Sequence, residues 1–326
     1  MAELTYLAAL REATALEMRA DKRVHVLGED VAEGGPFGAT KGLVEEFGAA
    51  RVRNTPISES TVMGIATGMA LAGLRPVFEV MFVDFLTLAI DQLANQAAKA
   101  RYMSGGQLSC PLVVRTAAGA GRRYGAQHSQ SLEAWLAHVP GLKVAMPATA
   151  ADAAGLLRTA IRDENPCVVV EAKLLYYRKE DVASLEPVPF GHAAVRREGR
   201  HATVVATARL VGEALVAADE LAREGIEITL IDPCTLVPLD LDTIVSSVRR
   251  TGCCVVAHEA PIRGGFGAEI AALVQEHAID QLTAPVARVG GADAPVPAAP
   301  ALEDAYMVGA RDIIAAVRGL VGGHKR

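Results

Sequence analysis

Two polar residues of this 326-residue chain, Glu59 and His128, have types and settings that suit proton transfer. Glu59 ends the run Pro-Ile-Ser-Glu, and His128 lies within Gln-His-Ser-Gln. A carboxylate can hold a proton, and an unperturbed imidazole titrates at about pH 6.5, so both groups can exchange protons near neutrality. Each also has a structural explanation: the helix dipole stabilises an acid in a first helical turn, and loop histidines are usually satisfied by hydrogen bonds. Residue type alone leaves both interpretations open.

The common self-contained catalytic motifs are absent from the sequence. It contains no GxxxxGK[ST] phosphate loop, no GxSxG elbow, no HExxH and no Cys/His spacing suited to zinc. The glycines of residues 119–125 come nearest to a dinucleotide fingerprint, but the last one is a residue too far along the chain. A second run, Gly264–Gly267, precedes a predicted helix and would suit an anion there, but we favour a tight turn.

Composition argues against several classes of function. The net charge of −6, with scattered Lys and Arg, leaves no basic face for nucleic acid. No apolar run reaches the roughly 18 residues of a membrane span, and charged Arg11 and Glu12 follow the start directly, so we expect no signal peptide. Five cysteines without a CxxC pair favour reduced thiols in a cytoplasmic protein. The hydrophobic share of 51% suits a subunit interface.

Short β-branched segments alternate with Ala- and Leu-rich segments along the first half of the chain. The predicted strands are Val24–Gly28, Val77–Phe82, Leu112–Arg115, Lys143–Met146 and Cys167–Glu171. The predicted helices are Glu12–Ala20, Ser60–Ala72, Asp84–Tyr102, Ser131–Val139 and Ala150–Arg162. This alternation predicts parallel strands joined by crossover helices, with both faces of the sheet covered.

The same alternation returns from residue 203, after a charged and proline-containing stretch. The predicted strands are Thr203–Thr207, Glu227–Asp232, Cys253–His258 and Val286–Val289, and the predicted helices are Leu210–Arg223, Leu241–Arg250, Phe266–Ile279 and Arg311–Leu320. We therefore predict an α/β protein with two doubly wound domains, residues 1–185 and 201–326, joined by a linker over residues 186–200.

Several motifs follow one another in an order that resembles a known family. They are Leu27-Gly-Glu-Asp-Val31, Asn54-Thr-Pro-Ile-Ser-Glu59, Gly73-Leu-Arg-Pro-Val77, Met81-Phe-Val-Asp-Phe85, Tyr102-Met-Ser-Gly-Gly106, Gln127-His-Ser-Gln130, Pro140-Gly-Leu-Lys-Val144 and Ile231-Asp-Pro-Cys-Thr-Leu236. Together they resemble the beta subunits of the thiamine diphosphate-dependent, decarboxylating component of 2-oxo acid dehydrogenase complexes, and of the related acetoin dehydrogenases. The ordered set runs from about Val24 to Glu303, so the resemblance covers nearly the whole chain.

The resemblance implies a transketolase-like architecture that needs a partner. The first domain would be the pyrimidine-binding domain for thiamine diphosphate, and the second a transketolase C-terminal-like domain. In heterotetrameric members, an alpha subunit binds the diphosphate and Mg²⁺ through a GDG motif, which this chain lacks. The implied assembly is an α₂β₂ heterotetramer in which this chain supplies half of the active site, with a lipoyl acyltransferase core as a further partner.

The resemblance also assigns roles to particular residues. Glu59 matches the family glutamate that hydrogen-bonds the pyrimidine N1′ and so favours the imino tautomer, which removes the C2 proton of the coenzyme. Met81 and Phe85 match positions that line and stack on the aminopyrimidine ring, although a spacing of four also suits the core side of a helix start. His128 matches the histidine that helps deliver protons when the acyl unit passes to lipoamide.

Two further features carry open alternatives. Family members with this pattern hold a structural K⁺ ion with oxygen ligands, which would here come from Leu112, Ala160, Ile161, Asp163 and Asn165. A helix C-terminal turn before Pro166 accounts for the last two residues equally well. Arg122 and Arg123 depart from the pyruvate-type pattern, and the sequence leaves lipoyl binding and simple solvation open for them.

The implied activity is that of a pyruvate dehydrogenase-like beta subunit, which acts in oxidative decarboxylation of a small 2-oxo acid with acyl transfer to the lipoyl acyltransferase. An acetoin dehydrogenase beta subunit is the nearest rival, because Arg115–Gly121 and Glu171–Lys173 also resemble that subfamily. A non-catalytic assembly or regulatory subunit is a third possibility, against which the presence of Glu59 and His128 counts. The Tyr-Met-Ser-Gly-Gly run counts against a split transketolase-type carbon transferase. Pyruvate, a branched-chain 2-oxo acid and acetoin all remain open as substrates.

Overall fold

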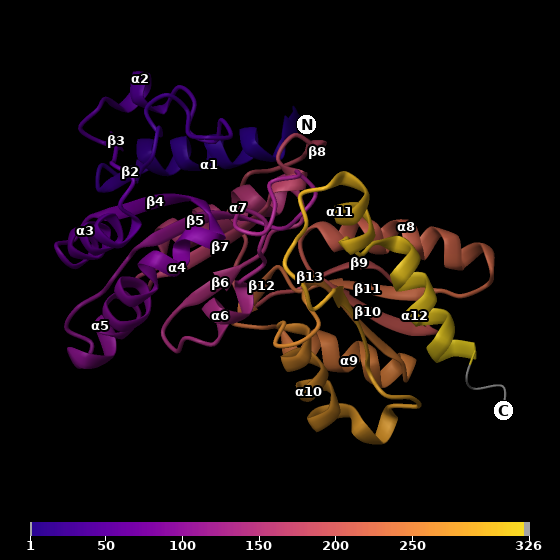
Figure 1. Ribbon diagram of the computed structural model, residues 1–326. Helices are drawn as coiled ribbons and strands as arrows, with labels where there is room; N and C mark the ends of the chain where they lie inside the picture. Colours follow the sequence, from indigo (N-terminus) through magenta and orange to yellow (C-terminus); the bar gives the residue numbers. More distant parts are fainter. Residues whose placement is uncertain (1, 323–326) are drawn as a thin grey trace. The chain divides into compact units, whose positions relative to one another are not determined.

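Parallel β-sheets with flanking helices form both halves of the computed structural model, which describes residues 2–322 (Figure 1). The chain divides into two units. The first contains the described residues up to Ala118 and then Trp135–Phe190, and the second contains Gly119–Ala134 and the described residues from Gly191 onward. No helix within residues 2–322 is long and apolar enough to cross a membrane.

The sheet of the first unit has its parallel strands in the order β6, β7, β5, β4, β2, β3. The strands are β2 (Val24–Gly28), β3 (Val52–Asn54), β4 (Arg75–Phe82), β5 (Val113–Ala118), β6 (Lys143–Ala145) and β7 (Cys167–Ala172). Every residue of β5 and β7 is buried, because helices cover both faces of a sheet of this kind. A separate antiparallel pair joins β1 (Ala2–Thr5) to β8 (Lys179–Val182).

Helices α1 and α7 pack together on one face of this sheet, and α3 and α4 pack on the other (Figure 1). The helices of this part of the chain are α1 (Tyr6–Ala20), α2 (Leu43–Phe47), α3 (Glu59–Leu71), α4 (Val83–Asp91), α5 (Ala98–Met103), α6 (Glu133–Ala137) and α7 (Ala150–Arg162). The hydroxyl of Thr5 accepts a hydrogen bond from the Ala8 amide at 3.1 Å, which caps α1 and explains its early start.

The chain order of the strands creates a switch point between β2 and β4. From β2 the chain crosses to β3 on one side, and then returns to β4 on the other side of β2. In open α/β sheets, ligands bind outside the carboxyl ends of the strands at such a point. Gly28, the last residue of β2, fits here because a β-carbon would lie 2.8 Å from the Glu79 carbonyl oxygen of β4, and its φ of +156° disfavours other residues.

The second unit has a sheet in the order β14, β13, β10, β11, β9, with only β9 antiparallel to its neighbour. The strands of this sheet are β9 (Ala194–Arg197), β10 (Ala202–Ala206), β11 (Ile228–Asp232), β13 (Cys254–Pro261) and β14 (Ala287–Gly291), and the short β12 (Thr235–Val237) lies outside it. Its helices are α8 (Arg209–Arg223), α9 (Leu241–Thr251), α10 (Gly267–Ala278), α11 (Pro300–Tyr306) and α12 (Ala310–Gly322). Apolar side chains of α9 and α10 form one core cluster with β10, β11 and β13.

The predicted α/β class with two doubly wound domains is confirmed, and the main strands and helices lie close to their predicted positions. The predicted single helix Asp84–Tyr102 is instead α4 and α5 with a π-helical stretch, Gln92–Ala97, between them. The predicted linker contains β9. The five cysteines are all buried and free.

Candidate active site

Glu59 lies at the carboxyl edge of the first sheet, beside the switch point. It is the first residue of α3, and its side chain is only 8% exposed. The segment that leads to it is tied to β2, because the Thr55 amide donates to the Gly28 carbonyl at 2.9 Å. The Asn54 side chain accepts from the Ala32 amide at 2.8 Å, which fixes the same segment to the turn after β2. A buried carboxylate at a helix N-terminus thus borders the expected ligand position.

A second carboxyl group, Glu29, accompanies Glu59 at this edge. Glu29 is half-buried and directly follows β2. Burial raises the pKa of Glu29, and the negative charges of Glu59 and Asp30 raise it further. Glu29 therefore keeps its proton to a higher pH than an exposed glutamate. An acid whose pKa is shifted by burial and by a charged neighbour is typical of functional sites.

Met81 and Phe85 lie at the end of the neighbouring strand β4 and at the start of α4, and both are half-buried. The Phe82 ring lies edge-on to the Phe85 ring with centroids 6.0 Å apart, and edge-on to the Phe37 ring at 5.6 Å. The ammonium of Lys173 lies 5.0 Å from the Phe82 ring centroid, a cation–π contact. The packing of Phe82 therefore stabilises the position of the segment that contains Met81 and Phe85.

Beneath this segment, Arg115 forms ion pairs with two buried acids of neighbouring strands. It donates to Glu79 at 2.7 Å and to both oxygens of Glu171, at 2.8 and 2.9 Å. The Tyr176 hydroxyl also donates to Glu171, at 2.9 Å. Met81 borders the same group, where a cavity of about 10 Å³ has room for about one water. Sequence reasoning missed this cluster, because nothing in an apolar strand pattern identifies the partners of Arg115.

His128 belongs to the second unit and is half-buried in the loop of residues 119–132. The base of this loop is closed by the Gly119 amide, which donates to the Gln130 carbonyl at 2.9 Å. The His128 amide donates to the Gly125 carbonyl at 3.4 Å. Arg123, for which the sequence left two explanations open, binds the side chains of Glu303 and Asp304 at 2.8 and 2.6 Å.

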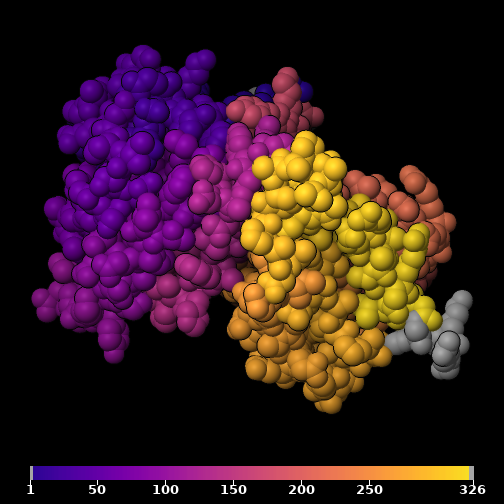
Figure 2. Space-filling model, viewed as in Figure 1, coloured from indigo at the N-terminus to yellow at the C-terminus, as the bar shows by residue number. Residues whose placement is uncertain are grey.

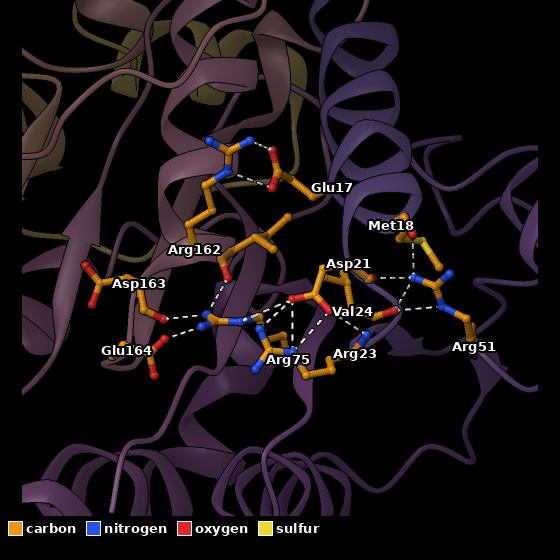
Figure 3. A network of polar contacts seen from close by, with 11 residues as sticks. Glu17, Met18, Asp21, Arg23, Val24, Arg51, Arg75, Arg162, Asp163 and Glu164 are labelled. Carbon is orange, nitrogen blue, oxygen red and sulfur yellow. Dashed lines mark hydrogen bonds and ion pairs between the residues drawn. The ribbon is translucent and has the colours of Figure 1, made fainter.

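The residues of the predicted K⁺ site lie at the opposite, amino edge of the first sheet, around the end of α7. Arg75 donates to the carbonyl oxygens of Ile161 and Asp163, each at 3.0 Å, and forms an ion pair with Glu164. Figure 3 shows the contacts of Arg75 with Asp163 and Glu164. The Asp163 carboxylate binds Lys143 and accepts from the Asn165 amide at 2.9 Å. Two cationic side chains therefore already contact oxygens that the ion would use.

The other two predicted ligands also take part in main-chain hydrogen bonds. The Leu112 carbonyl accepts from the Cys167 amide at 2.9 Å, and the Ala160 carbonyl accepts from the Asp163 amide at 3.2 Å. A carbonyl oxygen has two lone pairs, so these bonds leave capacity for a cation. Burial alone would raise the pKa of Asp163, but hydrogen bonds from Lys143 and Asn165 outweigh it and lower that pKa, which keeps the carboxylate charged.

The structure thus places Glu59, Met81 and Phe85 on adjoining elements of the first unit, the ion-site residues at the other edge of the same sheet, and His128 in the second unit. Glu29 and Glu303 were not singled out from the sequence. The sequence offered a signal for Glu29, which lies inside the Leu27–Val31 motif. It offered no signal for Glu303, because the loop that Glu303 contacts lies about 180 positions away in the chain.

Comparisons with known proteins agree with this geometry. Residues 2–179 match the family model for the transketolase pyrimidine binding domain, and residues 191–313 match the model for the transketolase C-terminal domain. A solved split-gene transketolase, described as an inactive beta4 tetramer, superposes with a TM-score of 0.80 at 25% identity and covers 98% of both chains.

The curated relatives are beta subunits of one enzyme group. The chain is 45% identical to the pyruvate dehydrogenase E1 component subunit beta of Rickettsia felis, over 97% of this chain and 98% of that one. It is 43% identical to the acetoin:2,6-dichlorophenolindophenol oxidoreductase subunit beta of Bacillus subtilis, over 96% of both. The 2-oxoisovalerate dehydrogenase subunit beta of Bacillus subtilis is 42% identical, over 98% and 99%. The chain therefore belongs to the transketolase-like family of 2-oxo acid and acetoin dehydrogenase beta subunits.

Proposed function

We propose that this chain is the beta subunit of a pyruvate dehydrogenase-like enzyme, which oxidatively decarboxylates a small 2-oxo acid and transfers the acyl group to a lipoyl acyltransferase. The observation that carries the proposal is the buried carboxylate of Glu59, at the carboxyl edge of the sheet beside the switch point. An acid in this place can hold a proton for a bound ring while the surrounding apolar residues exclude water.

The residues around Glu59 suit the pyrimidine half of thiamine diphosphate. The Glu59 carboxylate would share a proton with a ring nitrogen, and the half-buried side chains of Met81 and Phe85 would contact the apolar faces of the ring. When bound, the coenzyme supplies a nucleophilic carbon and an electron sink. The chain would thus orient the ring and control its protonation, and Glu29 would keep a second proton near Glu59.

His128 would act after decarboxylation, by exchanging a proton at its imidazole while the acyl group passes to lipoamide. The residue is half-buried, so it is accessible to a ligand. An imidazole ring can both accept and donate a proton through its two nitrogens. The support for this role is the Gln-His-Ser-Gln match together with the closed loop that holds the residue.

An alpha subunit is proposed to bind the diphosphate and Mg²⁺. The chain has no GDG motif for this purpose. Large apolar side chains are exposed on and around α3, α4 and α5: Ile57 is 80% exposed, Tyr102 88% and Met103 67%, and Ile65 and Leu88 are also exposed. Exposed apolar groups of this density mark interaction surfaces. We also retain K⁺ as a proposed structural ion at Leu112, Ala160, Ile161, Asp163 and Asn165.

Glu59→Gln in the assembled alpha–beta enzyme tests the central role. Glutamine keeps the size of the side chain but cannot hold the shared proton, so exchange of the coenzyme C2 proton should slow by on the order of 10²-fold or more. Assembly should be unchanged. Glu45→Gln, on the exposed face of α2, is the matched control and should exchange like the wild type. Exchange at the wild-type rate in Glu59→Gln would refute the role.

Acetoin cleavage is the second candidate function, because the acetoin-specific relative is nearly as similar to this chain as the pyruvate-specific relatives are. Both reactions would use Glu59 in the same way. They differ in the product that is released, carbon dioxide from a 2-oxo acid and acetaldehyde from acetoin. The assembled enzyme should therefore be assayed with pyruvate, 2-oxoisovalerate and acetoin, and the highest kcat/KM identifies the substrate.

A further inference from the structure

We propose that Glu303 is a positioning residue for His128, and that it acts by fixing the loop of residues 119–132 from the buried side. The inference rests on the proposed function of His128 and deepens it. Glu303 lies in α11, and its side chain is 0% exposed. Figure 2 shows the yellow C-terminal segment that contains α11 on the visible face of the second unit, to which the loop also belongs.

The carboxylate of Glu303 binds one short part of the loop. It accepts from the Gly121 amide at 2.8 Å, from the Arg123 amide at 3.1 Å and from the Arg123 guanidinium at 2.8 Å. These donors lie just after Gly119, whose own amide closes the base of the loop. His128 therefore lies on a segment that is held at its base and along its first half.

The backbone of Arg123 supports this interpretation. Its φ is +63°, in the left-handed region that non-glycine residues rarely adopt. Such conformations persist where the surroundings determine them more strongly than local preference does, and they concentrate at functional sites. Here the surroundings include Oε2 of Glu303, which accepts hydrogen bonds from both the amide and the guanidinium of Arg123.

Burial gives the contact its strength. A carboxylate removed from water is costly unless charged or hydrogen-bonding groups compensate it, and here the donors come from the loop. The neighbouring Asp304 also binds Arg123, at 2.6 Å, but its side chain is largely exposed. Exposed pairs of this kind contribute little to structure. Asp304 is therefore a matched control on the same helix and the same guanidinium.

The test uses the chain assembled with its alpha subunit, with two rates measured for each variant. One is the rate with the lipoyl acyltransferase as acceptor, which includes the step proposed for His128. The other is the rate with an artificial dye as electron acceptor, which bypasses that step. Glu303→Gln should lower the lipoyl-dependent rate by on the order of tenfold to a hundredfold, as small misplacements of reacting groups do, and leave the dye-dependent rate near wild type. Asp304→Asn should change neither.

A double mutant separates positioning from a general structural role. If Glu303 acts through His128, Glu303→Gln should cause no further loss in a His128→Asn background. An equal loss of both rates, an unchanged lipoyl-dependent rate, or a multiplied loss in the double mutant would each overturn the inference. If the Glu303→Gln variant does not assemble, Arg123→Gln is used in its place, because the partly exposed side chain of Arg123 is dispensable for the core. Arg123→Gln must then lower the lipoyl-dependent rate and leave the dye-dependent rate near wild type.

The proposed function can fail separately. If His128→Asn itself leaves the lipoyl-dependent rate intact, the role of His128 is refuted. If His128→Asn shows the loss but the Glu303 and Arg123 variants do not, the role of His128 stands and the positioning role of Glu303 is refuted.

Discussion

Arg115 and Glu171 form a two-point ion pair between adjacent strands, with Nε to Oε1 at 2.8 Å and Nη2 to Oε2 at 2.9 Å. Both side chains are almost completely buried. The third nitrogen of the guanidinium binds Glu79 at 2.7 Å, so one cation compensates two carboxylates. Burial raises the pKa of Glu79, while Arg115 opposes that rise.

Arg115→Met should be strongly destabilising, because it leaves two buried acids without their cation. Removal of one partner of a buried ion pair typically costs about 3–5 kcal/mol. Thermal unfolding should show a melting temperature several degrees below wild type. Arg318→Met is the matched control, since Arg318 pairs with Glu224 on the surface, and no measurable change is expected. Equal melting temperatures for the two variants would contradict the buried pair.

The fold was largely predictable because its main strands are apolar and its helices have regular patterns. The Cys-Val-Val-Val run predicted β7 to within one residue of its observed end. The predicted bounds of α7 are the observed ones. Short strands such as β3, β8 and β9 were missed, because elements of three or four residues, at least half of them polar, carry no periodic signal. The π-helical stretch was missed because its pattern of residues resembles that of an ordinary helix.

The candidate site was predictable only where a motif lies on one segment. Glu59, Met81 and Phe85 came from such motifs, and the structure adds their positions on adjoining elements. The contacts of Arg123 could not be predicted, because its partners Glu303 and Asp304 approach it only through the tertiary fold. Residues 119–134 belong to the second unit, although they precede part of the first unit in the chain. This grouping also depends on tertiary contacts, so it could not be predicted from the sequence.

Glu59→Gln should lower the raised pKa of Glu29. Burial raises that pKa most, and the negative charges of Glu59 and Asp30 raise it further. The substitution removes one of these two charges, so the pKa of Glu29 should fall, while burial still holds it above the ordinary value of a glutamate. The measurement is the pH titration of the Glu29 carboxyl carbon by NMR in the wild type and in Glu59→Gln, with the exposed Glu45→Gln as control. An unchanged pKa of Glu29 would show that the two carboxyl groups are not coupled.

Glu133→Gln should become progressively more stabilising as pH rises. Burial raises the pKa of Glu133 from the ordinary value of 4.5 to about 7. Between these values the folded state binds more protons than the unfolded state, so the contribution to stability is present below about pH 4.5 and is lost as pH rises through 7. The neutral glutamine escapes this loss, which amounts to roughly 3 kcal/mol at most.

Melting temperatures of wild type and Glu133→Gln at pH 5, 6, 7 and 8 measure the effect, as the difference between the two proteins at each pH. Other titrating groups, such as His258, cancel in that difference. Glu276→Gln, on the exposed side of α10, should differ from wild type by a constant amount. A constant difference for Glu133→Gln would mean that the buried carboxyl group is ionised throughout the range.

Gly267→Ala should destabilise the second unit, because the glycines of this region make room for the buried ring of His258. A β-carbon on Gly267 would lie 2.4 Å from His258 Cδ2, and one on Gly265 would lie 2.5 Å from Cε1. The run therefore does more than form the predicted turn, for which Gly264, with φ +70°, is sufficient. We expect a loss of about 1–3 kcal/mol, as overpacking of a core produces.

Gly319→Ala is the matched control for Gly267→Ala. Gly319 lies in α12 with open space around the added methyl group, so alanine should stabilise the helix by up to about 1 kcal/mol. Thermal melts of the two variants should thus move in opposite directions. A Gly267→Ala variant as stable as wild type would show that the His258 ring can shift at little cost.

K⁺ should raise the melting temperature of the chain relative to choline at equal ionic strength, if the oxygens at the end of α7 bind the ion as proposed. A ligand that binds only the folded state stabilises it in proportion to the logarithm of its concentration, so the increase should grow with KCl. Asp163→Asn removes the charged ligand, and it should abolish the difference between the salts. The Lys143 pair is lost in both salts, so it does not affect that comparison. Identical melting curves in the two salts would show that Arg75 and Lys143 supply all the positive charge that these oxygens need.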